Sequence, residues 1–152
     1  MKFSGLSNEQ ARTLRAGGPD AFGNTPEAAV SDGGGVPCRS CLRQINAGAP
    51  YLILAHKPFE TTQPYSEIGP IFLCAEDCAD ADGTHPEVLT TSPDYLLKAY
   101  SADERIIYGT GAITPADQVA DYARSLLDRA DVAFVDARSA KNNCWLARIT
   151  RD

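Results

Sequence analysis

The sequence predicts an α+β fold in which a mainly antiparallel sheet is covered by one or two helices, with long loops rich in glycine and proline. Three observations support this prediction. The apolar runs in the first half are short and flanked by proline, a later segment has the period of an amphipathic helix, and the last part resembles a β-hairpin. Because this order of elements contains few βαβ repeats, an antiparallel arrangement is favoured.

A single domain is expected to span residues 1–152. The chain has 152 residues, of which 43% are apolar, and a domain of this length buries roughly 68–70% of its unfolded surface. The stretch from Asp20 to Pro37 is rich in glycine and proline, and we interpret it as a long loop within this domain. A linker would require an independent domain before it that is too short to bury a core unaided.

A short first helix is expected over residues 7–15. Ser7 is followed three residues later by Gln10, which is the spacing of a capping box. Gly17 and Gly18, followed by a proline, end this helix.

Two short apolar runs predict strands in the first half of the chain. They cover residues 51–55 and 71–74, and each is bounded or opened by proline. The segment between them, residues 57–68, is punctuated by prolines and is expected to be an extended loop. Loops of this length are often functional.

A strand over residues 105–113 is expected next, with Gly109 and Gly111 marking a bulge or a close backbone approach. The clearest helix follows it, with Thr114 as its cap, Pro115 at its first position and Asp117 completing the box. Its apolar face has the spacing of a buried helix surface. That face consists of Val119, Tyr122, Ala123, Leu126, Leu127 and Ala130.

The end of the chain predicts a β-hairpin. Residues 132–137 and 145–150 are rich in strand-forming residues. Residues 139–143 between them have the composition of a turn.

The charge distribution argues against nucleic acid as a partner. The net charge is −6, and the basic residues are scattered singly along the chain. Neither a secretory signal nor a run of roughly 20 apolar residues is present, so a cytoplasmic protein without a membrane contact is expected. The remaining partner classes are a small molecule and another protein, in an oligomeric state that the sequence leaves open.

Four of the five cysteines form two close pairs. Cys38 and Cys41 make the first pair, Cys74 and Cys78 make the second, and 32 residues separate the two pairs. Disulfides do not persist in a reducing compartment, which favours metal binding or thiol chemistry. Tetrahedral zinc takes four thiolates, and a close pair supplies two of them from one short turn. The sequence therefore predicts a zinc site, which requires Cys38 and Cys74 to lie within about 10–12 Å of each other.

The residues around the two pairs act on such a site in opposite directions. Arg39 and Arg43 beside the first pair would favour four thiolates around one divalent ion, which carry a net charge of −2. Glu76 and Asp77 beside the second pair would disfavour it. No glycine follows Cys41, where a zinc-binding turn typically has one.

Three alternatives to a structural zinc site remain open. The cysteines could pack as small apolar groups, or Cys38 and Cys41 could form a reversible dithiol in a thiol-redox protein. The third alternative is a small enzyme that acts through a thiolate or a metal-bound water. Its pocket would lie near Tyr65, Glu67, His56 and Cys144. No known motif spacing identifies a nucleophile with its base, so the catalytic residues are unassigned.

Several motifs spread along the chain form a recognisable pattern. They are Pro37-Cys38-Arg39, the strand at residues 52–54, the segment 64–72 and Asn143-Cys144-Trp145. With these motifs the sequence resembles the bacterial family called domain of unknown function 1203, over nearly the whole chain. That family has no established activity, so no catalytic or binding residue is carried over. The resemblance implies a small, single-domain, bacterial cytoplasmic protein in which a partner for Cys41, and hence a metal site, is a feature of a subset.

Overall fold

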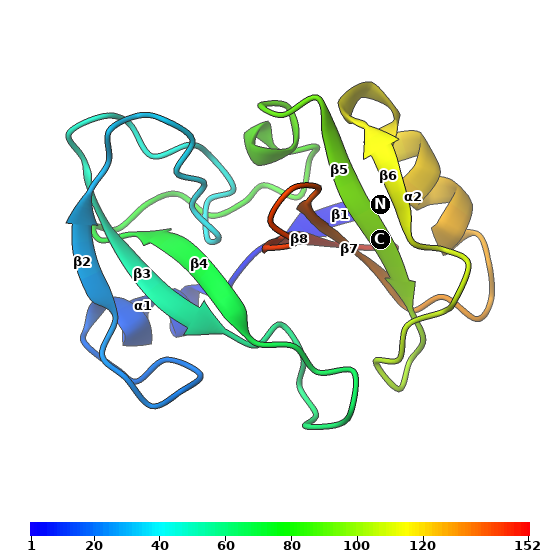
Figure 1. The fold of residues 1–152 in the computed structure, drawn as a ribbon, viewed down its shortest axis with the longest axis horizontal. Coiled ribbons are helices and arrows are strands. Elements are labelled where there is room, and N and C mark those ends of the chain that lie inside the picture. Colours follow the sequence, from blue (N-terminus) through cyan, green and yellow to red (C-terminus); the bar gives the residue numbers. More distant parts are fainter.

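A computed structural model describes residues 1–152 and has an α+β fold with two antiparallel sheets (Figure 1). Its elements in chain order are β1 (Lys2–Ser4), α1 (Asn8–Arg15), β2 (Glu27–Val30), β3 (Pro50–His56), β4 (Gly69–Cys74), η1 (Glu87–Leu89), β5 (Asp94–Tyr100), β6 (Ala112–Pro115), η2 (Ala116–Gln118), α2 (Val119–Leu127), β7 (Phe134–Ser139) and β8 (Trp145–Thr150). None of the helices has the length and apolar character needed to cross a bilayer. The predicted fold class is confirmed, with two sheets in place of one.

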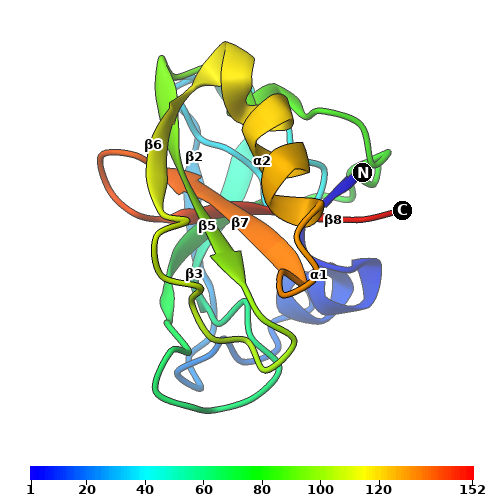
Figure 2. The same cartoon turned by 90° about the vertical axis from the view of Figure 1, so that its right-hand side faces the viewer.

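The larger sheet has five strands in the order β1-β8-β7-β5-β6. Helix α2 lies against one face of this sheet and contacts β5, β6 and β7 (Figure 2). Val119 and Ala123 of the helix share one apolar core with Leu97 of β5 and Val135 of β7, and all four side chains are fully buried. Burial of this apolar area stabilises the sheet without help from any ion.

The smaller sheet has three strands in the order β2-β3-β4, with α1 beside it (Figure 1). Its apolar core is separate from the first one, and it combines Ala11 and Leu14 of α1 with Leu54 of β3 and Leu73 of β4. The edge strand β2 is largely exposed. The assignment of residues 1–152 to a single domain stays a prediction.

Polar contacts join the two sheets. The Nε of Arg39 donates to the carbonyl oxygen of Trp145 in β8 at 2.8 Å. In the opposite direction, Nη2 of Arg148 in β8 donates to the carbonyl oxygen of Pro58, which follows β3, at 2.5 Å. Each guanidinium group therefore donates a hydrogen bond to a backbone carbonyl oxygen on the other side of the junction.

The link between β1 and α1 is also fixed at this junction. The amide of Leu6 donates to the carbonyl oxygen of Arg39 at 2.6 Å. A Cβ added at Gly5 would lie 2.0 Å from that same oxygen. Only glycine allows the backbone to approach so closely here.

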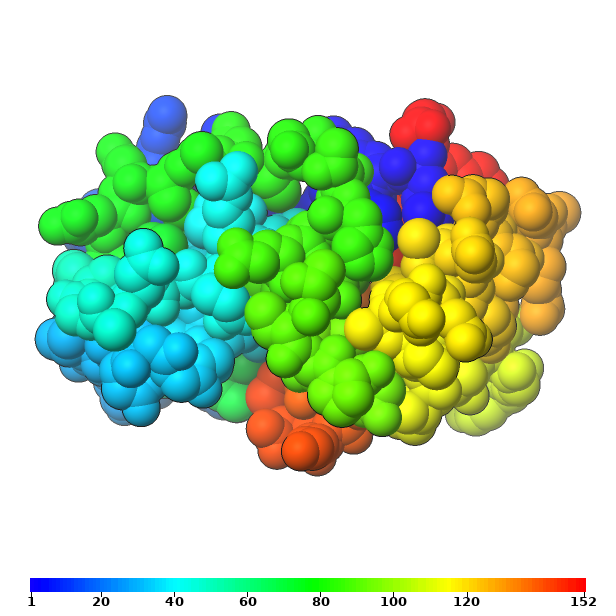
Figure 3. Space-filling model, turned by 90° about the horizontal axis from the view of Figure 1, so that it is seen from above, coloured from blue at the N-terminus to red at the C-terminus, as the bar shows by residue number.

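The segment between β4 and β5 covers the junction on one side (Figure 3). Its η1 helix contributes the amide of Val88, which donates to the carbonyl oxygen of Leu42 at 3.2 Å. A second contact joins the Gln44 amide to the Thr91 hydroxyl at 3.1 Å. The turn that contains the first cysteine pair is thus held from both sheets.

Several predicted elements are confirmed. Helix α1 has the expected capping box, with Ser7 and Gln10 bonded in both directions. Strands β3 and β4 and the terminal hairpin of β7 and β8 form where the sequence indicates, and residues 57–68 contain no helix or strand.

Two predictions about strands were wrong, and one strand was missed. The stretch 20–37 contains β2, which pairs with β3 through Glu27 to Val30. Most of the strand expected over residues 105–113 is a loop, because Gly109 has φ +86° and turns the chain, and Tyr108 is 77% exposed. Strand β5, which lies between β7 and β6 in the larger sheet, was not predicted at all.

The start of the second helix was also wrong. Helix α2 begins at Val119 and has no side-chain cap. Thr114, the expected cap, is buried in β6, where pairing with Tyr95 of β5 takes precedence over helix initiation. Ala130, expected on the buried face, is exposed.

Candidate metal centre

The first cysteine pair lies on a tight turn over residues 38–43. The amide of Cys38 donates to the carbonyl oxygen of Arg43 at 2.9 Å, and the amide of Leu42 donates to that of Cys38 at 3.1 Å. Leu42 has φ +57°, the left-handed conformation that glycine usually supplies. This conformation costs a residue with a side chain about 1–2 kcal/mol. Burial of the Leu42 side chain in the core of the larger sheet offsets that cost.

The missing glycine after Cys41 is therefore no obstacle to a metal-binding turn. The absence of a glycine argued against the site at the sequence level, but Leu42 takes the backbone conformation that a glycine would have supplied. In doing so it anchors the cysteine turn to the larger sheet.

The second pair reaches the first through β4. Cys38 forms a parallel bridge with Phe72, and the amide of Arg39 donates to the carbonyl oxygen of Phe72 at 2.9 Å. Strand β4 ends at Cys74, two residues later, and Cys78 follows in the next loop. This pairing brings the first cysteine pair next to the second.

The four sulfurs form one compact cluster. The Sγ atoms of Cys38, Cys41, Cys74 and Cys78 all lie within 4.8 Å of one another. In a tetrahedral site with bonds of about 2.3 Å, the sulfurs are roughly 3.8 Å apart. The Sγ atoms of Cys38 and Cys78, for example, are 4.0 Å apart. The cluster thus fits a metal ion after small adjustments, and the requirement that Cys38 and Cys74 lie close together is met.

Hydrogen bonds to sulfur support a thiolate at Cys38. Its Sγ accepts from the backbone amides of Ser40 at 3.4 Å and Cys74 at 3.3 Å. The thiols of Cys41 and Cys74 lower the pKa of Cys38 further, and the same contact with Cys38 raises the pKa of Cys41 to about 12. Without a metal, the cluster would therefore share protons around one thiolate. A cation that replaces these protons would relieve the competition among the four groups.

One cation at the cluster was missed by the sequence analysis. Arg15, at the end of α1, donates from Nη2 to the Sγ of Cys78 at 3.1 Å and from Nε to the carbonyl oxygen of Cys74 at 2.9 Å. Its Nη1 pairs with Asp77 at 3.3 Å. The acidic side chain of Asp77, which is 91% exposed, is thereby neutralised and directed outward. No spacing rule relates Arg15 to cysteines about 60 residues away.

The basic residues next to the first pair serve another purpose. Arg39 is 2% exposed, and the carbonyl oxygens of Pro37 and Trp145 accept its hydrogen bonds. Burial lowers its pKa to about 10. The charge of Arg39 still interacts favourably with the Cys38 thiolate, as the sequence suggested, whereas the hydrogen bonds from a cation to the cluster come from Arg15. The same expectation for Arg43 stays a prediction.

Three of the four residues expected at an enzyme pocket do line one cavity. His56, Glu67 and Cys144 border a cavity of about 290 Å³ between the two sheets. The fourth, Tyr65, is absent from its lining. Its hydroxyl lies 3.2 Å from that of Tyr108, and Arg105 lies over its ring.

This cavity lacks the contacts of a nucleophile and its base. The nearest acceptor bonded to the Cys144 thiol is the carbonyl oxygen of Asn142, at 3.7 Å. Burial, followed by the charges of Arg148 and Arg39, lowers the pKa of His56 to about 4. His56 is therefore neutral at pH 7, but too weak a base to activate a thiol efficiently.

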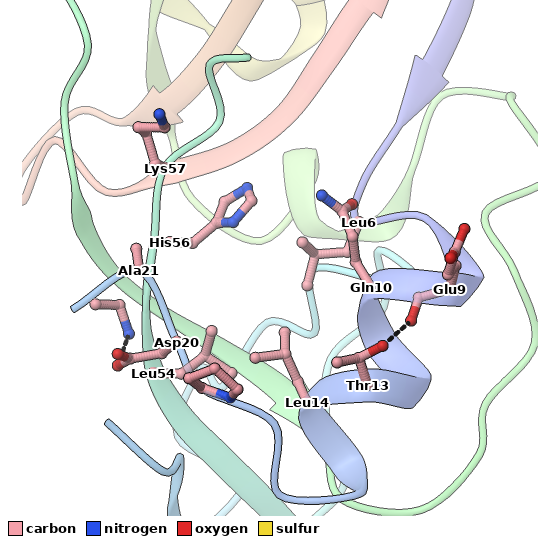
Figure 4. Close-up of a pocket in the computed structure, with 12 residues that line it drawn as sticks. Leu6, Glu9, Gln10, Thr13, Leu14, Asp20, Ala21, Leu54, His56 and Lys57 are labelled. Carbon is pink, nitrogen blue, oxygen red and sulfur yellow. Dashed lines mark hydrogen bonds between the residues drawn. The ribbon is translucent and has the colours of Figure 1, made fainter. Parts of the chain in front are cut away.

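A second cavity, of about 380 Å³, lies between α1 and β3 (Figure 4). The carboxylate of Asp20, which is partly exposed, lines this cavity. It already accepts from the backbone amides of Phe22, Asn24 and Ala55. These bonds lower its pKa and fix the loop after α1 onto β3, so we interpret Asp20 as structural.

Comparison with known families gives one match. A family model described as "Protein of unknown function (DUF1203)" matches residues 35–151. This range includes all four clustered cysteines and Cys144, but neither α1 nor Arg15. Neither the curated proteins nor the solved structures contain a match.

Proposed function

Because the chain belongs to the family described as "Protein of unknown function (DUF1203)", which names no activity, we propose a function from the site itself. The protein is a binding module in which zinc, held by Cys38, Cys41, Cys74 and Cys78, fixes the cysteine turn onto the end of β4. The observation that carries this proposal is the convergence of four sulfurs within 4.8 Å.

The donor set supports zinc as the ion. Four sulfur ligands in a tetrahedral arrangement are typical of zinc or of iron–sulfur centres, whereas calcium and magnesium prefer oxygen. A single compact group of four sulfurs leaves room for one ion. Zinc is the common ion in such closed four-cysteine sites.

A structural role follows from the number of ligands. Catalytic zinc keeps one position open for water or substrate, and four cysteines fill all positions of a tetrahedral ion. The protein would then use zinc to hold its shape, and bind a small molecule or another protein elsewhere. Free thiols in this number favour a reducing compartment, so we infer that the protein works in the cytoplasm.

Metal analysis of the purified protein tests the proposal. We expect one zinc per chain, and loss of most of it in Cys78→Ser. The matched control is Cys144→Ser, which removes the one cysteine outside the cluster and should retain the metal.

Two results would contradict the proposal. Visible absorption from iron, together with iron in the metal analysis, would replace zinc. A protein that contains no metal and forms a reversible disulfide between Cys38 and Cys41 would instead support the thiol-redox alternative.

A further inference from the structure

The cavity between the two sheets contains buried donors that have no partner. Arg138 of β7 is 3% exposed, and its Nε makes no hydrogen bond. The indole Nε1 of Trp145, a side chain that is 6% exposed, is also buried without a partner. Both residues line the cavity of about 290 Å³ that His56, Glu67 and Cys144 also border. Buried donors without partners are costly, so two of them around one cavity point to a missing acceptor.

The side chains around this cavity carry more positive than negative charge. Nη2 of Arg138 pairs with Oε2 of Glu67 at 2.6 Å, and Nζ of Lys98 pairs with Oε1 of the same carboxylate at 3.4 Å. One carboxylate thus serves two largely buried cations. The next acid, Asp136, is fully buried and is paired with Arg148 at 2.8 Å. One positive charge therefore remains uncompensated in a chain whose net charge is −6.

We propose that the cavity bordered by Arg138, Trp145 and His56 binds a small organic molecule through its carboxylate. This inference goes beyond the zinc module and does not depend on the identity of the ion. The two unpartnered N–H groups donate hydrogen bonds to the carboxylate oxygens, and the added negative charge balances Arg138 and Lys98. The volume suits a molecule of a few carbon atoms, since cavities for larger ligands begin at about 300 Å³.

The apolar part of the lining indicates where the rest of the ligand lies. Pro70 and Ile71 of β4 border the same cavity as Arg138. An acid with a short hydrocarbon tail would place its carboxylate at the guanidinium and its tail against these two residues. Neutral His56 can donate one further hydrogen bond without adding a charge.

The single tryptophan of the chain makes a direct test possible. The indole ¹⁵N–¹H resonance of Trp145 is followed while ¹⁵N-labelled, metal-loaded protein is titrated with sodium propionate at constant ionic strength. We expect a saturable shift that sodium chloride does not produce. Sodium phosphate forms a separate arm, and saturation by phosphate at lower concentration than by propionate would overturn the assignment to a carboxylate.

Substitution of Glu67 is expected to strengthen ligand binding, whereas most substitutions in a binding site weaken it. Because its carboxylate competes with the ligand for Arg138, Glu67→Gln should bind propionate about tenfold more tightly, a factor worth about 1.4 kcal/mol. Glu27→Gln, on the exposed edge strand β2, is the matched control and should leave the affinity unchanged. Arg138→Lys should weaken binding at least about tenfold, because lysine lacks the Nε donor.

Besides tighter binding of phosphate, three outcomes would overturn the proposal. They are a shift that does not saturate, an affinity that falls or stays constant in Glu67→Gln, and equal affinity in a folded Arg138→Lys protein. If Arg138→Lys does not fold, the Glu67→Gln measurement still decides, because a general loss of structure cannot tighten binding.

Discussion

The two sheets hold their strands together by different physical means. The five-stranded sheet surrounds a continuous apolar core closed by α2, in which Leu97 and Val135 have no exposed surface. The three-stranded sheet has a smaller core, an exposed edge strand and four converging thiols. The larger sheet therefore has an apolar core sufficient to hold it together, whereas the smaller sheet has less apolar burial and four thiols that could complete its core by holding an ion.

Metal removal should produce the largest difference in stability between the two sheets. Structural zinc contributes apparent free energies of about 10–16 kcal/mol in small zinc-dependent units, which exceeds the stability of many whole domains. We expect a strong chelator to remove amide-exchange protection from β3 and β4 while β5, β7 and β8 remain protected. Hydrogen exchange read by mass spectrometry measures both sheets at once. Equal loss in both sheets would show that the two units fold only together, and no loss would show that the metal is dispensable.

Truncation of one leucine in each core should give the next largest effect. Leu97→Ala in the larger core should cost about 2–5 kcal/mol, with or without the chelator. Leu73→Ala in the smaller core should cost a similar amount in the metal-loaded protein. After chelation its cost should largely vanish, because the strands around it are already disordered. Chemical denaturation of both variants, with and without chelator, tests the contrast, and an unchanged cost for Leu73→Ala would contradict it.

The sequence predicted the parts of the smaller sheet that local rules determine. The spacing of the cysteine pairs indicated the cluster, and the Ser7 and Gln10 capping box indicated α1. The apolar runs at β3 and β4 were recognised because proline bounds them. These features depend on residues close together in the chain.

The remaining errors have physical causes. Strand β5 buries Tyr95, Leu97 and Ala99 in alternation, but its sequence does not alternate in the same way because the apolar Leu96 lies on the other face, and the strand was instead expected over residues 105–113. Most of that segment does not form a strand because Gly109 turns the backbone. Partners such as Arg15 and Cys78 meet only through tertiary packing, so no spacing in the sequence could have paired them.

Acidification should lower the stability of the protein through His56, at the junction between the two sheets. His56 is held neutral by burial, with the charges of Arg148 and Arg39 nearby, and its pKa falls from 6.5 to about 4. Its contribution to stability is complete above the unfolded value near 6.5 and is lost as the pH falls toward 4, because the unfolded state binds the proton first. The shift corresponds to roughly 3–4 kcal/mol as an upper bound.

The measurement is the free energy of unfolding from pH 7 to pH 4 in wild type and in His56→Gln. The variant should lose less stability over this range than wild type does. His85→Gln is the matched control, since His85 is exposed and meets the ring of Phe3 edge to face. Parallel curves for wild type and His56→Gln would mean that other groups cause the acid sensitivity.

The smallest expected effect concerns Arg15 of α1. This helix lies outside the residues that the family model matches, yet Arg15 contacts the candidate metal centre. Arg15 donates to the Sγ of Cys78 and the backbone of Cys74, contacts that orient the second pair. Loss of such a partner typically lowers metal affinity 10–100-fold, so Arg15→Gln should weaken zinc binding by about that factor in competition with a chelator. Arg12→Gln, an exposed position on the same helix, should have no effect. If both variants bind zinc as wild type does, the four sulfurs alone hold the ion, and α1 packs on the smaller sheet without contributing to its metal.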